Sequence, residues 1–375
     1  MIYQTPYLDR SNQSCYNNPM KKERVVVAMS GGVDSSVAAA LLKEQGYEVI
    51  GITMCFNLKD AERKKPACCG IQGIEDARRV CHKLGIKHYV LNMQKALSKH
   101  VIKDFLSEYA AGRTPNPCVR CNQYLKFGHL LKKALSLDAK YLATGHYVRI
   151  IKTKAGLQLK KAKDLHKDQS YFLYRLGQDQ LKHLLFPLGG YTKAQVRELA
   201  RKFGLAVADK IGSQEICFLP EVDYRPFLKN YLKNKIKSGE VVDRAGNILG
   251  SHKGVAFYTI GQREGLGIAL GHPVYVTKID PKNNELTLGP KKDVLKKQLL
   301  VKDAHFIVKP IKKRVVLRVR IRYNHREAAA EVIPCKNKLK IKFRQPQFAV
   351  TPGQSAVIYS GDSVLGGGII EKALD

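Results

Sequence analysis

A short run of residues suited to binding anions, Ser30-Gly31-Gly32-Val33-Asp34-Ser35-Ser36, follows a β-branched segment at 25–29. Ala and Leu recur at helical spacing directly after it, over 35–44. Two glycines let the backbone approach a phosphate closely, and amides and hydroxyls at the start of a helix are donors for an anion. The pattern therefore predicts an anion-binding loop between a strand and a helix. The alternative is a tight turn with a serine cap.

This loop differs from the two most familiar phosphate-binding motifs. Both G-x-x-x-x-G-K-[ST] and G-x-G-x-x-G are absent from the region. SGGVDSS instead resembles the pyrophosphate loop of the N-type ATP pyrophosphatases, which split ATP between its α and β phosphates and leave an adenylate on the substrate. Asparagine, argininosuccinate and GMP synthetases share that loop. The resemblance therefore implies a reaction type and no particular substrate.

A second candidate for chemistry is the C-x-x-C pair formed by Cys118 and Cys121. Pro115 and Pro117 bar a regular helix before Cys118, so the thiols are expected just ahead of a helix at 122–136. A helix N-terminus and neighbouring arginines lower the pKa of a thiol and favour the thiolate. Reactive sulfur, half of a zinc site, a redox dithiol and two inert buried thiols all fit this spacing.

The charge balance indicates a polyanionic partner. Lys and Arg number 65 against 32 Asp and Glu, which gives a net charge of +33. Two segments, 317–323 and 339–344, alternate strictly between apolar and basic residues, so each is predicted to be a strand with an apolar inner face and a cationic outer face. Lying side by side, they would form a basic surface for RNA or DNA. The alternatives are the solvated face of a small barrel and, for the net charge, an anionic lipid surface.

The elements that position these residues follow from periodicity. Strands are predicted at 25–29, 48–54, 87–91 and 141–144, and helices at 35–44, 74–84, 95–111 and 122–136. Strands alternating with helices predict an α/β domain with a parallel sheet covered on both faces. From about residue 215, short segments separated by Gly, Pro and Asn predict strands joined by turns.

Cysteine usage and the N-terminus indicate the compartment. Nine scattered cysteines are too sparse for a disulfide scaffold. Residues 1–21 lack the apolar core of a secretory signal and are expected to form a flexible extension. No apolar run approaches the roughly 20 residues that a membrane helix needs. The expected location is the cytoplasm, with no membrane partner.

A third cysteine, Cys217, lies in the segment Gly212-Ser213-Gln214-Glu215-Ile216-Cys217-Phe218-Leu219. Together with the two motifs above, the chain resembles the tRNA-specific 2-thiouridylases from about Val25 to Leu374; this family makes 2-thiouridine at the wobble position of certain tRNAs. Further matching segments are 143–147, 167–173, 258–263, 351–356 and 365–370. After the flexible extension at 1–21, the resemblance implies an ATP pyrophosphatase (adenine nucleotide alpha-hydrolase-like) catalytic domain at 22–212, a central domain at 213–280 and a tRNA-binding C-terminal β-barrel at 281–375.

The resemblance also implies site residues. The nucleophilic cysteine corresponds to Cys121 and the persulfide cysteine to Cys217. The ATP-binding residues correspond to Ala28, Met29, Ser30, Gly31, Gly32, Val33, Asp34, Ser35, Met54 and Gly145. Contacts to the target base correspond to Asn116, Pro117 and Cys118. Contacts to tRNA correspond to His146, Lys167, Asp168, Gln169, Arg322, Tyr323 and Gln354.

The implied chemistry uses ATP with Mg, a persulfide sulfur-donor protein and the glutamine, lysine and glutamate tRNAs. Many members carry Asp where this chain has Cys118, so the role of that carboxylate does not carry over. Cys118, Cys121 and Cys217 could alternatively bind three irons of a [4Fe-4S] cluster. No catalytic role is assigned to Cys68, Cys69 or Cys81. Rival functions are another RNA-directed ATP pyrophosphatase, such as a lysidine synthetase, and a noncatalytic basic RNA-binding protein.

Overall fold

The computed structural model describes residues 22–56, 70–210, 216–219, 223–233 and 236–374. The predicted extension at 1–21, and Cys68 and Cys69, lie outside the described residues. The chain divides into two compact units that alternate along the sequence. Unit 1 comprises 1–94, 125–170 and 176–218, and unit 2 comprises 95–124, 171–175 and 219–375. None of the described helices is long and apolar enough to span a membrane.

Unit 1 contains a parallel sheet, as the alternation of strands and helices predicted. Its strand order is β3-β2-β1-β4-β7. The strands are β1 (Arg24–Ala28), β2 (Glu48–Cys55), β3 (Lys87–Asn92), β4 (Tyr141–Ala143) and β7 (Leu184–Leu185). The first four match the predicted strands. The fifth, β7, has only two residues, which is too short to leave a periodic pattern in the sequence.

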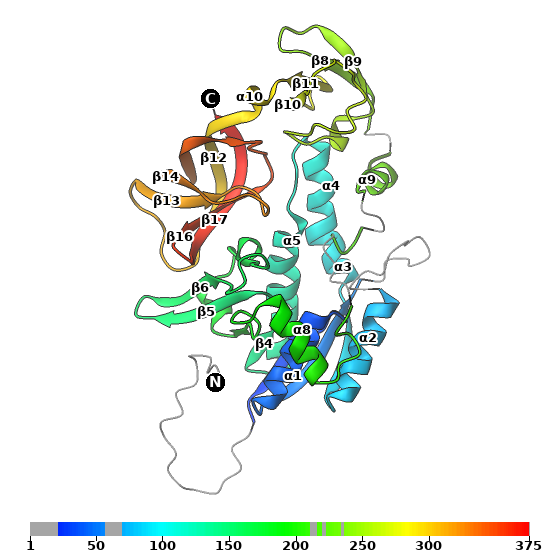
Figure 1. The fold of residues 1–375 in the computed structure, drawn as a ribbon, viewed down its shortest axis with the longest axis vertical. Coiled ribbons are helices and arrows are strands. Elements are labelled where there is room, and N and C mark those ends of the chain that lie inside the picture. The colour runs from blue at the N-terminus through cyan, green and yellow to red at the C-terminus, as the bar shows by residue number, and fades with distance from the viewer. Residues whose placement is uncertain (1–21, 57–69, 211–215, 220–222, 234–235, 375) are drawn as a thin grey trace, which may run out of the picture. The chain divides into compact units, whose positions relative to one another are not determined.

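Both faces of this sheet are covered. Val25, Val26 and Val27 follow one another along β1 and have no exposed surface, although successive side chains of a strand point to opposite faces. The covering helices include α1 (Val33–Glu44), α2 (Ile71–Lys83) and α8 (Lys193–Lys202), which Figure 1 shows beside the strands. Val196 and Ala200 of α8 belong to the same buried cluster as the apolar residues of α1. Unit 1 also contains a hairpin of β5 (Val148–Thr153) and β6 (Gly156–Lys161) and the short helix α7 (Gln178–Leu181).

The two helical stretches predicted at 95–111 and 122–136 are present, but each is divided. The first consists of α3 (Gln94–Leu97), the π-helix η2 (Ser98–Ile102) and α4 (Lys103–Ala110). The second consists of α5 (Pro117–Arg120), the π-helix η3 (Cys121–Leu130) and α6 (Leu131–Leu135). The predicted start at 122 was wrong. Proline is compatible with the first helical position, so Pro117 begins the helix and both thiols lie within it.

Unit 2 also contains a small sheet with strand order β10-β11-β8-β9. Its strands are β8 (Gly239–Val242), β9 (Ile248–His252), β10 (Tyr275–Asp280) and β11 (Glu285–Gly289). The helix α9 (Arg225–Leu232) precedes them. Val276, Leu286 and Leu288 form the centre of the apolar core of this sheet.

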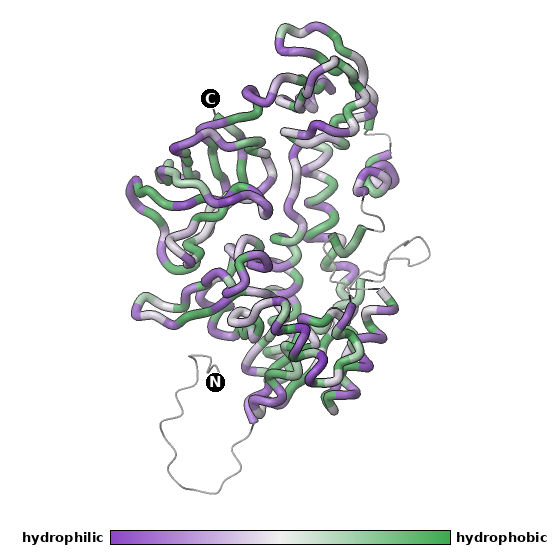
Figure 2. The backbone as a smooth tube through the Cα atoms, in the orientation of Figure 1, coloured by the Kyte–Doolittle hydropathy of each residue, from purple (hydrophilic) through white to green (hydrophobic). Residues whose placement is uncertain are grey.

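The C-terminal part of unit 2 is an antiparallel β-barrel, as expected. Its strands are β12 (Leu295–Phe306), β13 (Val315–Arg320), β14 (Ala328–Cys335), β15 (Lys338–Phe348), β16 (Ser355–Ser360) and β17 (Ser363–Leu374). They pair in the order β12-β15-β14-β13-β16-β17, and β12 also pairs with β17, which closes the barrel. Figure 2 shows hydrophobic and hydrophilic residues alternating along these strands. Apolar side chains, including Leu299, Ile341 and Ile358, fill the interior.

The two alternating basic segments correspond to β13 and β15. Leu339, Ile341 and Phe343 are buried while Lys342 and Arg344 are exposed, so the predicted alternation is confirmed for β15. The first segment was predicted to be a strand as far as residue 323, but β13 ends at Arg320 and Arg322 is half-buried. The two strands are not neighbours, however, because β14 pairs with both. In register, Glu331 of β14 lies between Val316 and Lys342. The basic outer face is therefore interrupted by a carboxylate and by small apolar residues.

Barrel closure sets a steric limit at Gly366, which pairs with Phe306 of β12 and Ile358 of β16. Its φ is +153°, and an added Cβ would lie 2.1 Å from the His305 carbonyl oxygen. We expect Gly366→Ala to destabilise the chain by about 2–3 kcal/mol, because it adds a backbone clash to an unfavourable dihedral angle.

The midpoint of thermal unfolding measures this effect. Gly361→Ala is the matched control, since Gly361 also has a positive φ of +57° but its added Cβ would meet no atom within 4 Å. The control is expected to cost only about 1 kcal/mol. Equal shifts of the two midpoints would contradict the proposed clash.

Candidate active site

The anion-binding loop lies between β1 and α1, as the sequence predicted. The Ser30 amide donates to the Ser35 Oγ atom at 3.2 Å, and Ser35 Oγ donates to the Gly32 carbonyl at 3.1 Å. Ser36 Oγ donates to the same carbonyl at 2.9 Å. The serine hydroxyls therefore close the turn and hold its shape, in addition to any contact with a ligand.

Two glycines allow the backbone around this loop to pack closely. Gly31 has a φ of +71°, and a Cβ there would lie 2.2 Å from the Gly73 carbonyl oxygen of α2. A Cβ on Gly145 would lie 2.7 Å from the Asp34 carbonyl carbon and 2.8 Å from the Ser35 amide nitrogen. Any larger side chain would displace the first turn of α1. The segment after β4 is therefore packed directly on the loop.

The predicted ATP-binding residues lie at one edge of the sheet. Ala28 pairs with Ile52, so Met54 of β2 lies beside the loop that follows Ala28. Gly145 follows β4, the neighbour of β1 on its other side. The structure thus brings residues 28–35 together with Met54 and Gly145 at the carboxyl ends of three parallel strands. Ligands of open parallel sheets bind at this edge.

Asp34, the carboxylate of the loop, is bound by two donors from distant segments. The Tyr147 hydroxyl donates to Asp34 Oδ1 at 2.7 Å, and the Lys193 ammonium donates to the same oxygen at 2.6 Å. Burial raises the pKa of Tyr147 well above its usual value, so its hydroxyl is a donor at neutral pH. Neither Tyr147 nor Lys193 was among the predicted ATP-binding residues.

Another lysine contacts the backbone of the loop. Lys210 Nζ donates to the Gly31 carbonyl at 3.0 Å and to Asp76 Oδ2 of α2 at 2.5 Å. Thr192 and Gln195 form a capping box, which identifies Lys193 from the sequence as the first residue of a helix. The capping box does not indicate which part of the fold that helix faces. No local pattern marks Lys210. Only the fold brings these two ammonium groups to the loop.

Several predicted tRNA contacts belong to unit 1 and have internal partners. His146 is buried, its Nδ1 lies 2.7 Å from Thr144 Oγ1, and burial together with Lys126 lowers its pKa well below the usual value. Asp168 is buried and accepts bonds from Ser170 and the Ala162 amide.

The neighbours of Asp168 also take part in this segment. Gln169 accepts from the Tyr147 amide at 3.0 Å, and Lys167 is half-buried. Asp168 and Gln169 therefore order the chain around Tyr147. Their contacts to RNA stay predictions.

The thiol pair lies at the start of a capped helix in unit 2. Asn116 is the N-cap, and its Oδ1 accepts from the Val119 amide at 3.3 Å. Cys118 is exposed, and Cys121 is buried with 9% of its surface exposed. Cys118 thus belongs to the first turn of the helix, where the positive end of the helix dipole favours a thiolate, and Cys121 follows one turn later.

The barrel supports the loop that precedes this helix. Gln354 Nε2 donates to the carbonyls of Thr114 at 3.1 Å and Pro115 at 2.8 Å. A Cβ on Gly353 would lie 2.7 Å from the Thr114 carbonyl oxygen. Gln354, a predicted tRNA contact, therefore also orients the Pro115-Asn116-Pro117 segment.

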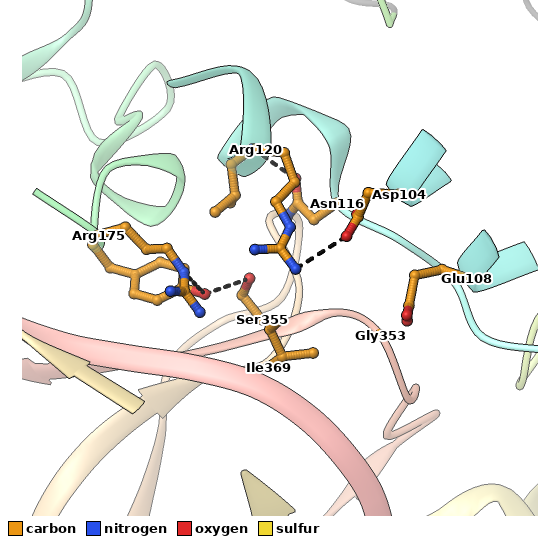
Figure 3. A pocket seen from close by; sticks show the side chains of 10 residues that line it. Asp104, Glu108, Asn116, Arg120, Arg175, Gly353, Ser355 and Ile369 are labelled. Atoms are coloured by element: carbon orange, nitrogen blue, oxygen red, sulfur yellow. Dashed lines mark hydrogen bonds and ion pairs between the residues drawn. The ribbon is translucent and has the colours of Figure 1, made fainter. Parts of the chain in front are cut away.

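The pocket in Figure 3 lies beside the thiol helix within unit 2. Its lining comprises Asp104, Glu108, Asn116, Val119, Arg120, Tyr174, Arg175, Gly353, Ser355 and Ile369. Arg120 pairs with Asp104 at 3.0 Å, and Arg175 pairs with Asp303. The two guanidinium groups of the lining are balanced by two carboxylates. The pocket is therefore polar but carries little net charge.

The last two predicted tRNA contacts lie where β13 ends. Arg322 donates to the Ile260 carbonyl at 2.9 Å and to Thr351 Oγ1, and burial lowers its pKa from the usual value. The ring of Tyr323 packs on Phe172 with centroids 4.5 Å apart, and Arg320 lies 5.3 Å above the Tyr323 ring. The hydrogen bond from Arg322 to Ile260 thus connects the barrel with the segment that precedes β10.

The other cysteines differ in their surroundings. Cys217 is half-buried and belongs to unit 1, whereas Cys118 and Cys121 belong to unit 2. Burial raises the pKa of Cys81 to about 12, which keeps that thiol protonated. Across the described ranges, no three His, Cys, Asp or Glu side chains form a group that could hold a metal ion.

Three family models match the chain in order. They are described as the tRNA methyl transferase HUP domain over residues 23–221, the tRNA methyl transferase PRC-barrel domain over 225–290 and the aminomethyltransferase beta-barrel domain over 296–370. They correspond to the parallel-sheet domain, the central domain and the C-terminal barrel. The expected α/β fold class with its two further domains is confirmed.

Among solved structures, a 4-thiouridine synthetase in complex with RNA and ATP superposes with a TM-score of 0.36 at 15% identity, over 57% of this chain and 51% of that one. A match at this level says nothing about activity.

Curated relatives match over nearly the whole length. A tRNA-specific 2-thiouridylase of Clostridium botulinum is 49% identical over 95% of this chain and 99% of its own. Those of Caldanaerobacter subterraneus and Halothermothrix orenii are each 51% identical over 93% of this chain, and the match covers 98% and 99% of their lengths. At this identity and coverage, the chain belongs to the tRNA-specific 2-thiouridylase family.

Proposed function

We propose that this chain is an ATP-dependent sulfurtransferase that replaces the C2 oxygen of the tRNA wobble uridine with sulfur, giving 2-thiouridine. The observation that carries this proposal is the 49% identity to a tRNA-specific 2-thiouridylase over 95% of the chain. Such a reaction needs one site for the nucleotide and one for the sulfur. The loop before α1 in unit 1 is the candidate for the first, and the helix that begins at Pro117 in unit 2 is the candidate for the second. The expected partners are the glutamine, lysine and glutamate tRNAs and a persulfide-carrying donor protein, in the cytoplasm. The domain boundaries near 212 and 280 belong to the same proposal.

The first step is adenylation of the uridine. The C2 oxygen attacks the α phosphorus of ATP, the bond from that phosphorus to the bridging oxygen breaks, and pyrophosphate leaves while the uridine loses its N3 proton. The C2 oxygen is a poor leaving group by itself. After adenylation it can leave as part of AMP, which is a good leaving group. Main-chain amides at the start of α1 would bind the phosphates.

Mg fits this loop chemically, since Mg bound with nucleotide phosphates needs only one or two protein carboxylates. Asp34 is the carboxylate in the loop. When bound, Mg would supply charge neutralisation of the phosphates.

The second step transfers sulfur, and the released base takes up a proton at N3 to replace the one lost on adenylation. The terminal sulfur of a Cys217 persulfide attacks the adenylated C2, and AMP leaves. The Cys121 thiolate then attacks the Cys217 sulfur and breaks its bond to the transferred sulfur, so 2-thiouridine is released and a Cys121–Cys217 disulfide forms. A dithiol reductant must supply two electrons before the next turnover. The place of Cys121 near a helix N-terminus supports its role as a thiolate.

The cluster hypothesis has weaker support. It requires Cys118, Cys121 and Cys217 as three iron ligands, and a C-x-x-C pair with one distant cysteine is a weak signal for a cluster. The exposed Cys118, in place of the Asp of many relatives, is the feature in its favour. We therefore derive no step through a cluster.

Replacing single cysteines separates these mechanisms. Cys121→Ala and Cys217→Ala are each expected to abolish 2-thiouridine formation, while Cys118→Ala retains it, as does Cys335→Ala at an exposed thiol of the barrel. The measurement is mass spectrometry of tRNA nucleosides after incubation with ATP, Mg and a persulfide source. It also tests the lysidine-synthetase alternative, which needs no reactive cysteine pair.

Anaerobic purification with iron analysis is the second arm. About four irons per chain, lost together with activity in Cys118→Ala, would overturn the persulfide mechanism in favour of the cluster. An active enzyme without iron eliminates the cluster. A noncatalytic RNA-binding protein would release neither AMP nor pyrophosphate.

The basic outer face of the barrel is proposed to hold the tRNA body. Chemistry on a base requires it to leave the stack, and an anticodon loop makes this inexpensive. The exposed cations on this face are Arg314, Arg318, Lys342 and Arg344. Arg314 pairs with Glu331, and the hydrogen bond from Arg314 holds the pKa of that carboxyl below its usual value. The other three are the better candidates for phosphate contacts.

Charge reversal tests this surface. The triple variant Arg318→Glu, Lys342→Glu, Arg344→Glu should raise the tRNA dissociation constant about tenfold or more and reduce the salt slope by about 0.9 per lost phosphate contact. ATP affinity should not change. The control reverses three exposed lysines of unit 1, Lys83, Lys132 and Lys133, and matches the change in net charge. The proposal fails if both triple variants weaken tRNA binding equally.

A further inference from the structure

The nucleotide loop lacks a cation of its own. Residues 28–36 contain no Lys or Arg and one acidic residue, Asp34. The N-terminus of a helix supplies only about half of a positive charge. A bound triphosphate, and still more a departing pyrophosphate, would need further positive charge at this position. The share of that charge that Mg would not supply must come from another part of the fold.

Lys193 of α8 reaches the carboxylate of the loop. Its ammonium lies 2.6 Å from Asp34 Oδ1, and the side chain is only 19% exposed. The Lys193 backbone amide donates to Asp164 Oδ2 at 3.0 Å, and the Thr192 hydroxyl caps the helix by accepting from the Gln195 amide. The start of α8 is thus anchored independently of the ammonium. Asp34 is the second residue of α1, so the ammonium lies at the same helix end as the amides that face a ligand.

We propose that Lys193 is a phosphate-binding catalytic residue, which contacts the β and γ phosphates of ATP and stabilises the departing pyrophosphate. The inference rests on the proposed use of ATP by this loop. When the bond between the α phosphorus and the bridging oxygen breaks, the electron pair stays on pyrophosphate, next to the ammonium. No proton is transferred from Lys193. Asp34 and Tyr147 hold the ammonium in position before ATP binds, which lowers the entropic cost of the contact.

Lys210 differs from Lys193 in its partners. Its ammonium donates to the Gly31 carbonyl and to Asp76, so it joins the backbone of the loop to α2. Lys210 is therefore a positioning residue of the loop. The Lys193 ammonium instead donates to a side chain of the loop, Asp34, and lies 5.9 Å from the centre of the Tyr147 ring.

Isothermal titration calorimetry of the full chain with ATP, inorganic pyrophosphate and AMP tests the proposal. Lys193→Met should weaken binding of ATP and pyrophosphate about tenfold or more, the loss of one charge-assisted contact. AMP, which lacks the β and γ phosphates, should bind within about twofold of the wild-type value. Lys193→Arg keeps the charge and should retain most of the ATP affinity. Lys202→Met, at an exposed position of the same helix, is the matched control.

Three outcomes would overturn the proposal. The first is unchanged ATP affinity in Lys193→Met. The second is an equal loss for AMP and ATP, which would mean that Lys193 only maintains the shape of the loop. The third is full recovery of ATP affinity in the double variant Lys193→Met, Asp34→Asn, which would mean that Lys193 acts only by neutralising Asp34. If the wild-type chain binds no ATP at all, the proposed function itself fails, and this result is distinct from the other three.

Discussion

The close backbone packing around the β1–α1 loop is the constraint on which the nucleotide site depends. Gly31 meets the backbone of α2 at Gly73, and Gly145 meets the first turn of α1, each at a distance that leaves no room for a Cβ. Amides can face a phosphate only if the surrounding chain comes this close without side chains in between. A loop built from glycines and other small residues also has no cationic side chain of its own. Lysines from later segments therefore supply the positive charge.

The thiol helix is likewise positioned by residues that are distant in the sequence. Pro117 and Asn116 define where the helix starts, so the two sulfur atoms fall within its first turns. The segment before it has little regular structure of its own, and Gln354 of the barrel holds its carbonyls. The barrel thus orients the segment that leads into the thiol helix.

The charge of the barrel is distributed less simply than its sequence indicates. Strands β13 and β15 have cationic outer faces, but β14 lies between them and contributes Glu331. Like charges directly opposite one another destabilise a sheet, and an intervening strand with a carboxylate relieves this repulsion. A strongly basic surface can therefore be stable on its own.

The sequence by itself determined the local elements and the chemistry that they carry. Apolar periodicity, the Ser30–Ser36 loop and the cysteine spacing depend on neighbouring residues, so the parallel sheet, the loop and the thiol helix were predictable. The predicted start of the thiol helix is wrong, because Pro117 does not exclude a helix but occupies its first position.

Only the tertiary structure decided which distant groups meet. Lys193 lies 159 positions from Asp34 and Lys210 lies 179 from Gly31, and no local pattern encodes such pairs. The insertion of β14 between the basic strands is likewise a matter of pairing order. Helix and strand propensities act over a few residues. The order in which strands pair, and which charged side chains surround a ligand, depend on how the whole chain packs.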